Sequence, residues 1–373
     1  MTPQTLQTGR LDSATAAVKA APAPPGAAAA CDPLAAVSRP QHLFRGSRQS
    51  GRVHPLWRLM LMRSAQSPGS ADGPASAPTP TPSVPAATLD KLSAAEVRQR
   101  VAELPPLPEA AMRALRTLRT LQREQTSLQE VAVELECDAS LTARILRLAN
   151  SPFYGVAGRI SSARDAAQLL GRRTLESMLT LAALTGQLQG PRSLSFDSAA
   201  FWRHAVATAI VSRRLARGVG ADESQAFVAG LLHDIGLLAM SVYFPQSLDA
   251  LLGQARAADL DLYATERQHD LTPHADVGAW IAAHWNFPAA VVRAIAVHHS
   301  PGAPAAGVDN LSACVHVANA VAHALDVAKL AHELVPSIDP LAWQRVALTD
   351  EDFLSLFAET EAGVQALCAA LAL

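Results

Sequence analysis

Apolar side chains recur at helical spacing through most of residues 89–330, and this repeat strongly limits the folds open to the chain. Met112, Leu115, Leu118 and Leu121 repeat every three residues in one such segment. No segment shows the alternation of a half-buried strand, and no Asn-Gly hairpin turn occurs. Ala and Leu dominate the composition and aromatic residues make up only 5%, which favours helix over sheet. The sequence therefore predicts an all-α, multi-helix fold.

Caps and breakers divide this pattern into separate helices. Ser93 and Glu96 have the spacing of a capping box, and Gly171 and the pair 190–191 mark interruptions. The predicted helices are 109–122, 127–135, a helix capped by Ser140 and stopped at 150–152, 163–170, 174–188, 201–217, 224–242, 248–258, 265–284, a helix opened by Pro288 and ending at 298–299, and 311–330.

Residues 1–88 differ in composition from the rest of the chain. They hold 13 of the 25 prolines, and such a segment buries too little apolar surface to offset its ordering entropy. We therefore predict a disordered Pro/Ala-rich region. A short apolar patch at 56–62 interrupts it, either as a small docking element or as chance sequence ahead of an alternative start at Met60 or Met62.

Charge and cysteine content exclude several classes of protein. Residues 1–88 carry a charge of +5 and the remainder −7, so the main part of the chain is not an obvious nucleic-acid binder. The four cysteines are scattered without a CxxC pair, which predicts neither a disulfide framework nor a zinc ribbon. No apolar run approaches the roughly 20 residues that span a bilayer. We expect a cytoplasmic protein without a membrane segment.

The run 231–236 (Leu-Leu-His-Asp-Ile-Gly) is the most informative motif for chemistry. His233 and Asp234 are adjacent and directly follow an apolar stretch, where an unpaired carboxylate would be costly to bury. One imidazole nitrogen and one carboxylate oxygen at this spacing suit one divalent metal, or two neighbouring ones. A His-Asp hydrogen bond without an ion remains the alternative.

Further histidines lie on other predicted helices and extend this candidate site. His204 begins one helix, His274 precedes Val277-Gly278, and His298-His299 ends another. Taken singly, His204 and His274 are better explained as structural histidines, and the His298-His299 pair can also be a solvated helix end. Side chains from facing helices build metal sites in bundles, so together they predict a metal site of His204, His233, Asp234, His274, His298 and His299. Imidazole with carboxylate suits Fe, Mn, Zn or Ni rather than Ca. The histidines without such context, which we expect at the surface or in the core, are His269, His284, His316, His323 and His332.

Several segments resemble the HDOD family, a bacterial branch of the HD superfamily. The stretch 104–108 (Leu-Pro-Pro-Leu-Pro) is similar to the family's opening proline motif, and 141–151 is similar to its LTARLLRLANS segment. Residues 160–171, 201–204 and 230–236 also match, as do 274–278, Trp285 with Pro288, and 298–299. The resemblance covers roughly residues 98–305 and implies an N-terminal helical subdomain packed on an HD-type helical core.

The resemblance divides the chain into a helical part at 89–190, an HD-like core at 191–305 and a helical extension at 306–373. It also implies a role in bacterial signal transduction. Related HD-GYP phosphodiesterases place Lys where this chain has Leu237, and HD enzymes supply a late Asp where it has Asn319. We therefore expect a regulatory module that contacts a protein partner, with a vestigial, metal-binding or nucleotide-binding pocket. The alternative is a metal-dependent phosphohydrolase acting on a nucleotide or cyclic dinucleotide.

Overall fold

The computed structural model describes residues 43–45, 54–66, 93–104, 117, 126–150, 160–184, 193–302, 308–330, 332–346 and 348–371. These residues form α-helices and no β-strand, which confirms the all-α prediction. The helices are α3 (Pro55–Gln66), α4 (Ala94–Ala102), α6 (Leu128–Glu136), α7 (Ala139–Ala149), α8 (Ala163–Leu184), α9 (Ser198–Val219), α10 (Glu223–Leu232), α11 (Ile235–Tyr243), α12 (Pro245–Ala258), α13 (Leu262–Gln268), α14 (His274–His284), α15 (Ala289–Ala296), α16 (Asn310–Ala324), α17 (Pro340–Val346) and α18 (Asp350–Leu371).

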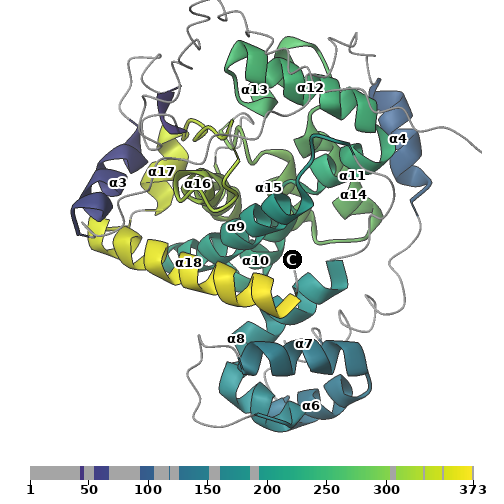
Figure 1. The fold of residues 1–373 in the computed structure, drawn as a ribbon, viewed down its shortest axis with the longest axis vertical. Coiled ribbons are helices and arrows are strands. Elements are labelled where there is room, and N and C mark those ends of the chain that lie inside the picture. Colours follow the sequence, from purple (N-terminus) through teal and green to yellow (C-terminus); the bar gives the residue numbers. More distant parts are fainter. Residues whose placement is uncertain are drawn as a thin grey trace, which may run out of the picture.

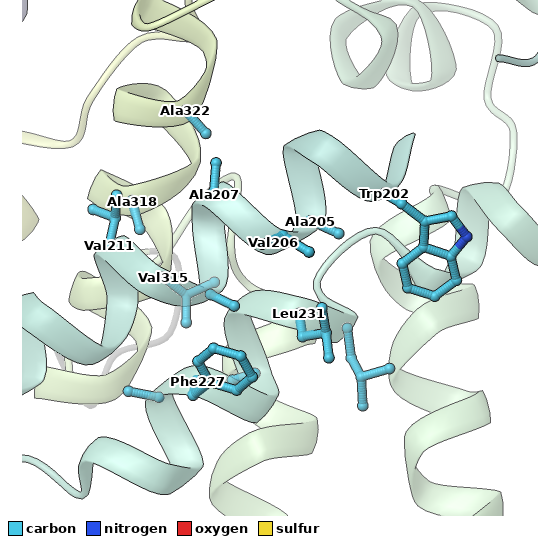
Figure 2. Packing of buried hydrophobic residues seen from close by; sticks show 14 of the residues in the cluster. Trp202, Ala205, Val206, Ala207, Val211, Phe227, Leu231, Val315, Ala318 and Ala322 are labelled. Carbon is cyan, nitrogen blue, oxygen red and sulfur yellow. The ribbon is translucent and has the colours of Figure 1, made fainter. Parts of the chain in front are cut away.

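Helix α9 lies at the centre of the core, with α10 and α16 packed against it. Figure 2 shows Ala207 and Val211 of α9 facing Ala318 and Ala322 of α16. All four side chains are buried. Small side chains at this contact allow the two helix backbones to approach closely. The central helix is therefore fixed on both sides, and the residues it carries are held in a defined position.

Other helices pack around this centre (Figure 1). Helices α6, α7 and α8 pack on one another at one end of the molecule, and α18 runs from α3 past α9 to contact α7. Helix α4 lies instead against α14, where the Arg98 guanidinium sits 4.4 Å from the centre of the Trp280 ring. Segment 93–104 thus packs on the helices that carry the candidate site.

The structure confirms several local predictions, including the helices predicted on either side of Gly171. The capping box of Ser93 and Glu96 is formed, and α6 begins after Ser127 as expected. Gly171 has φ of 71°, and helix α8 is kinked there. The predicted helix 109–122 and the interruption at 190–191 lie outside the described residues, apart from Thr117.

Two long predicted helices are each broken in the structure. The helix expected over 224–242 ends at Leu232 and restarts at Ile235, because the chain leaves helical geometry at Asp234. The helix expected over 265–284 is interrupted at 269–273, where Asp270 has a positive φ of 54° and Pro273 precedes α14. Both breaks put site residues at helix ends rather than along a helix face.

Three helix ends also differ from the prediction. Asp138, rather than Ser140, caps α7 by accepting a hydrogen bond from the backbone N–H of Leu141. The helix expected to reach 330 ends at Ala324, since Asp326 and Lys329 have positive φ. The helix before His298 ends at Ala296, so the histidine pair lies in the following turn.

The prediction that residues 1–88 are disordered is wrong for segments 43–45 and 54–66, because their apolar side chains find a core. Leu56 and Leu59 are buried, and α3 packs against α16 and α18. Phe44 stacks edge-on against Trp57 with ring centres 5.3 Å apart. The apolar patch at 56–62 is therefore a docking element. The rest of 1–88 lies outside the described residues.

Among the described residues, Glu223–Tyr243 is long and apolar enough to span a bilayer by length and hydropathy alone, so the expectation of no such run needs correction. This stretch is 72% buried within the protein, and buried core helices pass the same test. The described cysteines, Cys137, Cys314 and Cys368, are free, in keeping with the predicted absence of a disulfide framework.

Candidate metal centre

The break between α10 and α11 places His233 and Asp234 at the centre of the molecule. A close approach of α11 and α14 fixes this position. A Cβ on Gly236 would overlap the carbonyl oxygen of His274 and lie 2.8 Å from the amide nitrogen of Gly278. The glycine of the motif therefore allows α14 to bring His274 against Asp234.

The Asp234 carboxylate lies at the middle of a ring of imidazoles. Its Oδ2 is 3.2 Å from Nε2 of His233 and 3.8 Å from Nε2 of His204. Its Oδ1 is 3.2 Å from Nε2 of His274 and 3.4 Å from Nε2 of His298. His299 joins them, with Nε2 3.0 Å from that of His274. The structure thus brings all six predicted site residues into one cluster.

Hydrogen bonds on the outer side of the cluster orient three of these rings. Nδ1 of His233 donates to the carbonyl of Gly230 at 2.7 Å, and Nδ1 of His298 donates to that of Ile295 at 2.7 Å. Nδ1 of His274 lies 2.8 Å from Oε2 of the buried Glu266. Such outer bonds fix the tautomer and direct Nε2 inward, as at metal-binding histidines generally.

The remaining rings are held by side chains at the wall of the site. Nε2 of His204 lies 3.0 Å from Oδ1 of Asn319 on α16. His299 stacks on Tyr263, with ring centres 4.3 Å apart and an interplanar angle of 12°. Neither Glu266 nor Tyr263 is predicted by the sequence, because α13 carries no motif and its approach to α14 depends on the break at 269–273.

Burial and neighbouring charges set the protonation of the cluster. Burial lowers the pKa of His298 to about 4, and it lowers the pKa values of His204 and His299 well below the usual range. Burial also opposes the charged form of His274, but Glu266 and Asp234 outweigh it and raise its pKa to about 10. Three imidazoles are therefore neutral at pH 7, which is the form that binds metals.

Burial alone would raise the pKa of Asp234, but the neighbouring charge of His233 and the hydrogen bond from His274 outweigh it and hold that pKa well below its usual value. The carboxylate is therefore anionic at pH 7. Nδ1 of His298 carries the proton given to Ile295, so in the neutral ring the Nε2 lone pair faces the Asp234 carboxylate. Nε2 of His298 has no hydrogen-bond partner. A cation between the Nε2 lone pair and the carboxylate would remove the repulsion between them, so these ligand atoms fit a metal.

Two overlapping groups have the spacing of a metal site. One consists of Asp234, His274, His298 and His299, and the other of His204, His233 and Asp234, with ligand atoms within 4.8 Å of one another in each. Asp234 belongs to both, so the arrangement suits one ion or two neighbouring ions sharing this carboxylate.

A cavity of roughly 580 Å³ opens beside the cluster. His204, Asp234, His274, His299 and Asn319 line it, together with Leu237. The apolar side chains Leu194, Leu260 and Leu330 also line it. Any bound ion would thus face a space large enough for a small organic ligand.

The five histidines expected at the surface or in the core include one exception. His316 is structural, since its Nδ1 donates to the carbonyl of His298 at 2.6 Å and its Nε2 accepts from the backbone N–H of Asp339. His284 likewise lies 3.1 Å from the carbonyl of Leu104. His323 instead lines the cavity beside His204, with ring centres 4.4 Å apart, so the expectation is wrong for it. His332 also lines the cavity but is exposed, as expected.

An all-helical core that encloses a His/Asp cluster of this kind defines an HD-type protein. The HDOD domain family matches residues 104–301, and the chain belongs to this family. This confirms the resemblance drawn from the sequence motifs. What the cluster binds, and whether the protein turns over a substrate, are separate questions.

Solved structures with similar folds support this assignment. A candidate phosphohydrolase from Shewanella amazonensis SB2B is 26% identical with a TM-score of 0.58, and the match covers 75% of this chain and 99% of that one. A candidate signal transduction protein from Marinobacter aquaeolei VT8 is 25% identical with a TM-score of 0.57, covering 72% and 59% respectively. An uncharacterized protein of Treponema pallidum is 25% identical over 214 residues, which are 57% of this chain and 40% of that protein. The chain therefore spans less than half the length of this curated relative.

Proposed function

We propose that this chain is a regulatory HDOD protein of bacterial signal transduction that binds a divalent transition metal and acts by contacting a protein partner. The observation that carries the proposal is a retained histidine cluster whose cavity wall has an apolar side chain, Leu237, at the position where related phosphodiesterases have lysine. The site thus keeps metal-binding groups while lacking a cation expected for catalysis.

The metal-binding half of the proposal is supported by the inward-facing Nε2 atoms around Asp234. Their distances to the carboxylate, 3.2–3.8 Å, suit ligands that close on an ion. Iron, manganese, zinc and nickel are the candidates for this imidazole and carboxylate set. When bound, such an ion lowers the pKa of a coordinated water towards neutrality.

The regulatory half is supported by two altered positions. Leu237 offers no charge to a developing phosphate anion, a contribution that is often worth about 3 kcal/mol at active sites. Asn319 presents a neutral amide oxygen, which already interacts with His204 and is a weaker ligand than a carboxylate. Both changes disfavour turnover more than they disfavour metal binding.

The mouth of the cavity supports contact with a protein partner. Leu194, Leu260 and Leu330 line the cavity and are also exposed, Leu194 with 87% of its surface accessible. Exposed apolar side chains beside a cavity are typical of interaction sites. We propose that the partner docks over this mouth, so that the state of the metal cluster affects the contact.

A metal-dependent phosphohydrolase is the second candidate. The supporting observation is that Arg45, Arg256 and Lys329 line the same cavity as the cluster, which gives it cationic groups for a nucleotide or cyclic dinucleotide. Arg45 is already paired with Asp259, which reduces its availability to such a ligand. The similarity to the candidate phosphohydrolase from Shewanella also supports this alternative.

Metal content and turnover measured on the same full-length preparations distinguish the two candidates. We expect purified protein to contain a transition metal at Asp234, and Asp234→Asn to lose that ion while remaining folded by circular dichroism. His284→Gln, a histidine substitution outside the cavity, is the matched control and should keep the metal. The metal-loaded protein should not hydrolyse nucleotides or cyclic dinucleotides. Hydrolysis that disappears in Asp234→Asn would favour the phosphohydrolase, and a metal-free wild type that takes up no added ion would contradict both.

A further inference from the structure

A second cluster of potential ligands lies in the same cavity. It consists of His204 on α9, His323 in the last turn of α16, and Glu333 in the segment between α16 and α17. Their ligand atoms lie within 4.8 Å of one another. Neither His323 nor Glu333 belongs to the groups around Asp234.

The second cluster contains two buried polar atoms that lack a hydrogen-bond partner. These are Oε2 of Glu333 and Nδ1 of His204. Glu333 is only 4% exposed, and its other oxygen, Oε1, accepts a hydrogen bond from Nδ1 of His323 at 3.0 Å. A buried carboxylate oxygen without a donor is costly. A cation or a water molecule at this point would remove that cost.

The chain holds Glu333 at this position by contacts on both sides of it. Positive φ values at Asp326 and Lys329 turn the backbone after α16. Val335 then donates its N–H to the carbonyl of Leu43 at 2.9 Å, and His54 donates to the carbonyl of Pro336 at 2.9 Å. The N-terminal segments 43–45 and 54–66 therefore hold the stretch that carries Glu333 in place beside the cavity.

We propose that His204, His323 and Glu333 form a second metal site, distinct from the ion or ions at Asp234, which takes Zn²⁺ or a similar transition ion. Two imidazoles and one carboxylate are a common set of protein ligands for zinc with an open fourth position. All three residues line the cavity, so an ion has an entry path. The groups around Asp234 share only His204 with this site.

Zinc-edge anomalous diffraction from crystals of the full chain, grown with Zn²⁺ equimolar to the proposed sites, tests the wild type directly. We expect a peak at ligand distance, about 2.0–2.2 Å, from His323 and Glu333. The peak near Asp234 is a separate observation and bears on the proposed function. A peak at Asp234 alone, or a water molecule in place of the ion at Glu333, would overturn the second site.

Equilibrium dialysis of chelator-stripped protein against Co²⁺ gives an independent count of sites. Glu333→Gln and His323→Gln should each bind one equivalent fewer than wild type, and the visible Co²⁺ spectrum should lose one component. Asp234→Asn should keep the equivalent that Glu333→Gln loses, and His284→Gln should match wild type. Circular dichroism establishes that each variant is folded. Unchanged stoichiometry in both folded cavity variants would overturn the proposal, whatever happens at Asp234.

Discussion

Helices α6–α8 and the helices around Asp234 stabilise their folds in different ways. The described side chains buried in α6–α8 are apolar apart from Ser177 and Thr180, and residues 126–184 contain no histidine. The core around Asp234 instead buries four histidines of the cluster, namely His204, His233, His274 and His298, together with Glu266. Burying titratable groups weakens a fold unless each finds a partner. The first region therefore has a core that needs little polar pairing, whereas the second buries titratable groups around the candidate site at some cost in stability.

Gly236→Ala should show the largest effect, because it tests the packing that forms the site. Its Cβ would meet backbone atoms of His274 and Gly278, so α14 would have to move away. We expect a loss of more than about 3 kcal/mol in the free energy of unfolding, together with loss of bound metal. Denaturant unfolding and metal analysis measure both.

Gly171→Ala is the matched control in α8. No atom lies within 4 Å of its added Cβ, and only the positive φ of 71° opposes the substitution. It should cost about 1–2 kcal/mol and leave the metal bound. Equal costs at the two glycines would mean that the close approach of α11 and α14 does not constrain the core.

Ile145→Ala should separate stability from site chemistry. Ile145 of α7 is fully buried, and its truncation leaves a cavity in the helical part distant in sequence from Asp234. We expect a loss of about 2–5 kcal/mol in the free energy of unfolding with unchanged metal affinity. Isothermal titration with the metal ion measures the affinity. A marked loss of affinity in the folded variant would show that α6–α8 are coupled to the site.

Acidification should destabilise the metal-free protein through the buried histidines. The pKa of His298 is about 4 in the fold and about 6.5 when unfolded, so the unfolded chain binds more protons between these values. The contribution of His298 is full above pH 6.5 and is lost as the pH falls towards 4, by about 2 kcal/mol between pH 7 and pH 5. His204 and His299, whose pKa values are also lowered, act in the same direction. His274, with its raised pKa of about 10, loses its contribution instead as the pH rises above 6.5.

Urea unfolding at pH 7 and pH 5 in the presence of a chelator measures this dependence. His298→Gln should reduce the difference between the two pH values, since it removes one of the titrating groups. The helices α6–α8 contain no histidine and so add no histidine titration to it. A pH dependence identical in wild type and His298→Gln would show that this ring does not titrate as its burial requires.

The two regions also differ in how well the sequence predicts them. In α6–α8, the helix predicted over 127–135 begins after Ser127 in the structure, so pattern and structure agree there. The six site residues could be listed because His-Asp and His-His pairs stand out in the sequence. Their convergence on Asp234 could not be derived, since it depends on the breaks at 233–234 and 269–273 and on the contact at Gly236.

The roles of residues that act through distant contacts cannot be predicted from the local sequence. Glu266 and Glu333 lie in segments without a motif, and each becomes significant only through the histidine beside it. Likewise, Leu56 and Leu59 form a buried face only because α16 and α18 supply a surface far along the chain. Local periodicity predicts which segments are helical, whereas such partners follow from tertiary packing.

Two capping boxes, one on α6 and one on α4 beside the helices around Asp234, allow a small change in stability to be tested in both regions. Ser127 Oγ accepts from the N–H of Glu130 at 3.2 Å on α6, and Ser93 Oγ accepts from that of Glu96 at 3.2 Å on α4, which packs on α14. Ser127→Ala and Ser93→Ala should each lower the free energy of unfolding by about 1 kcal/mol, because the lost bond is local and exposed in both. Metal affinity should be unchanged in each. If Ser93→Ala also weakens metal binding, the orientation of α4 on α14 helps to position His274, and the boundary between the stable region and the functional core must be redrawn to include 93–104.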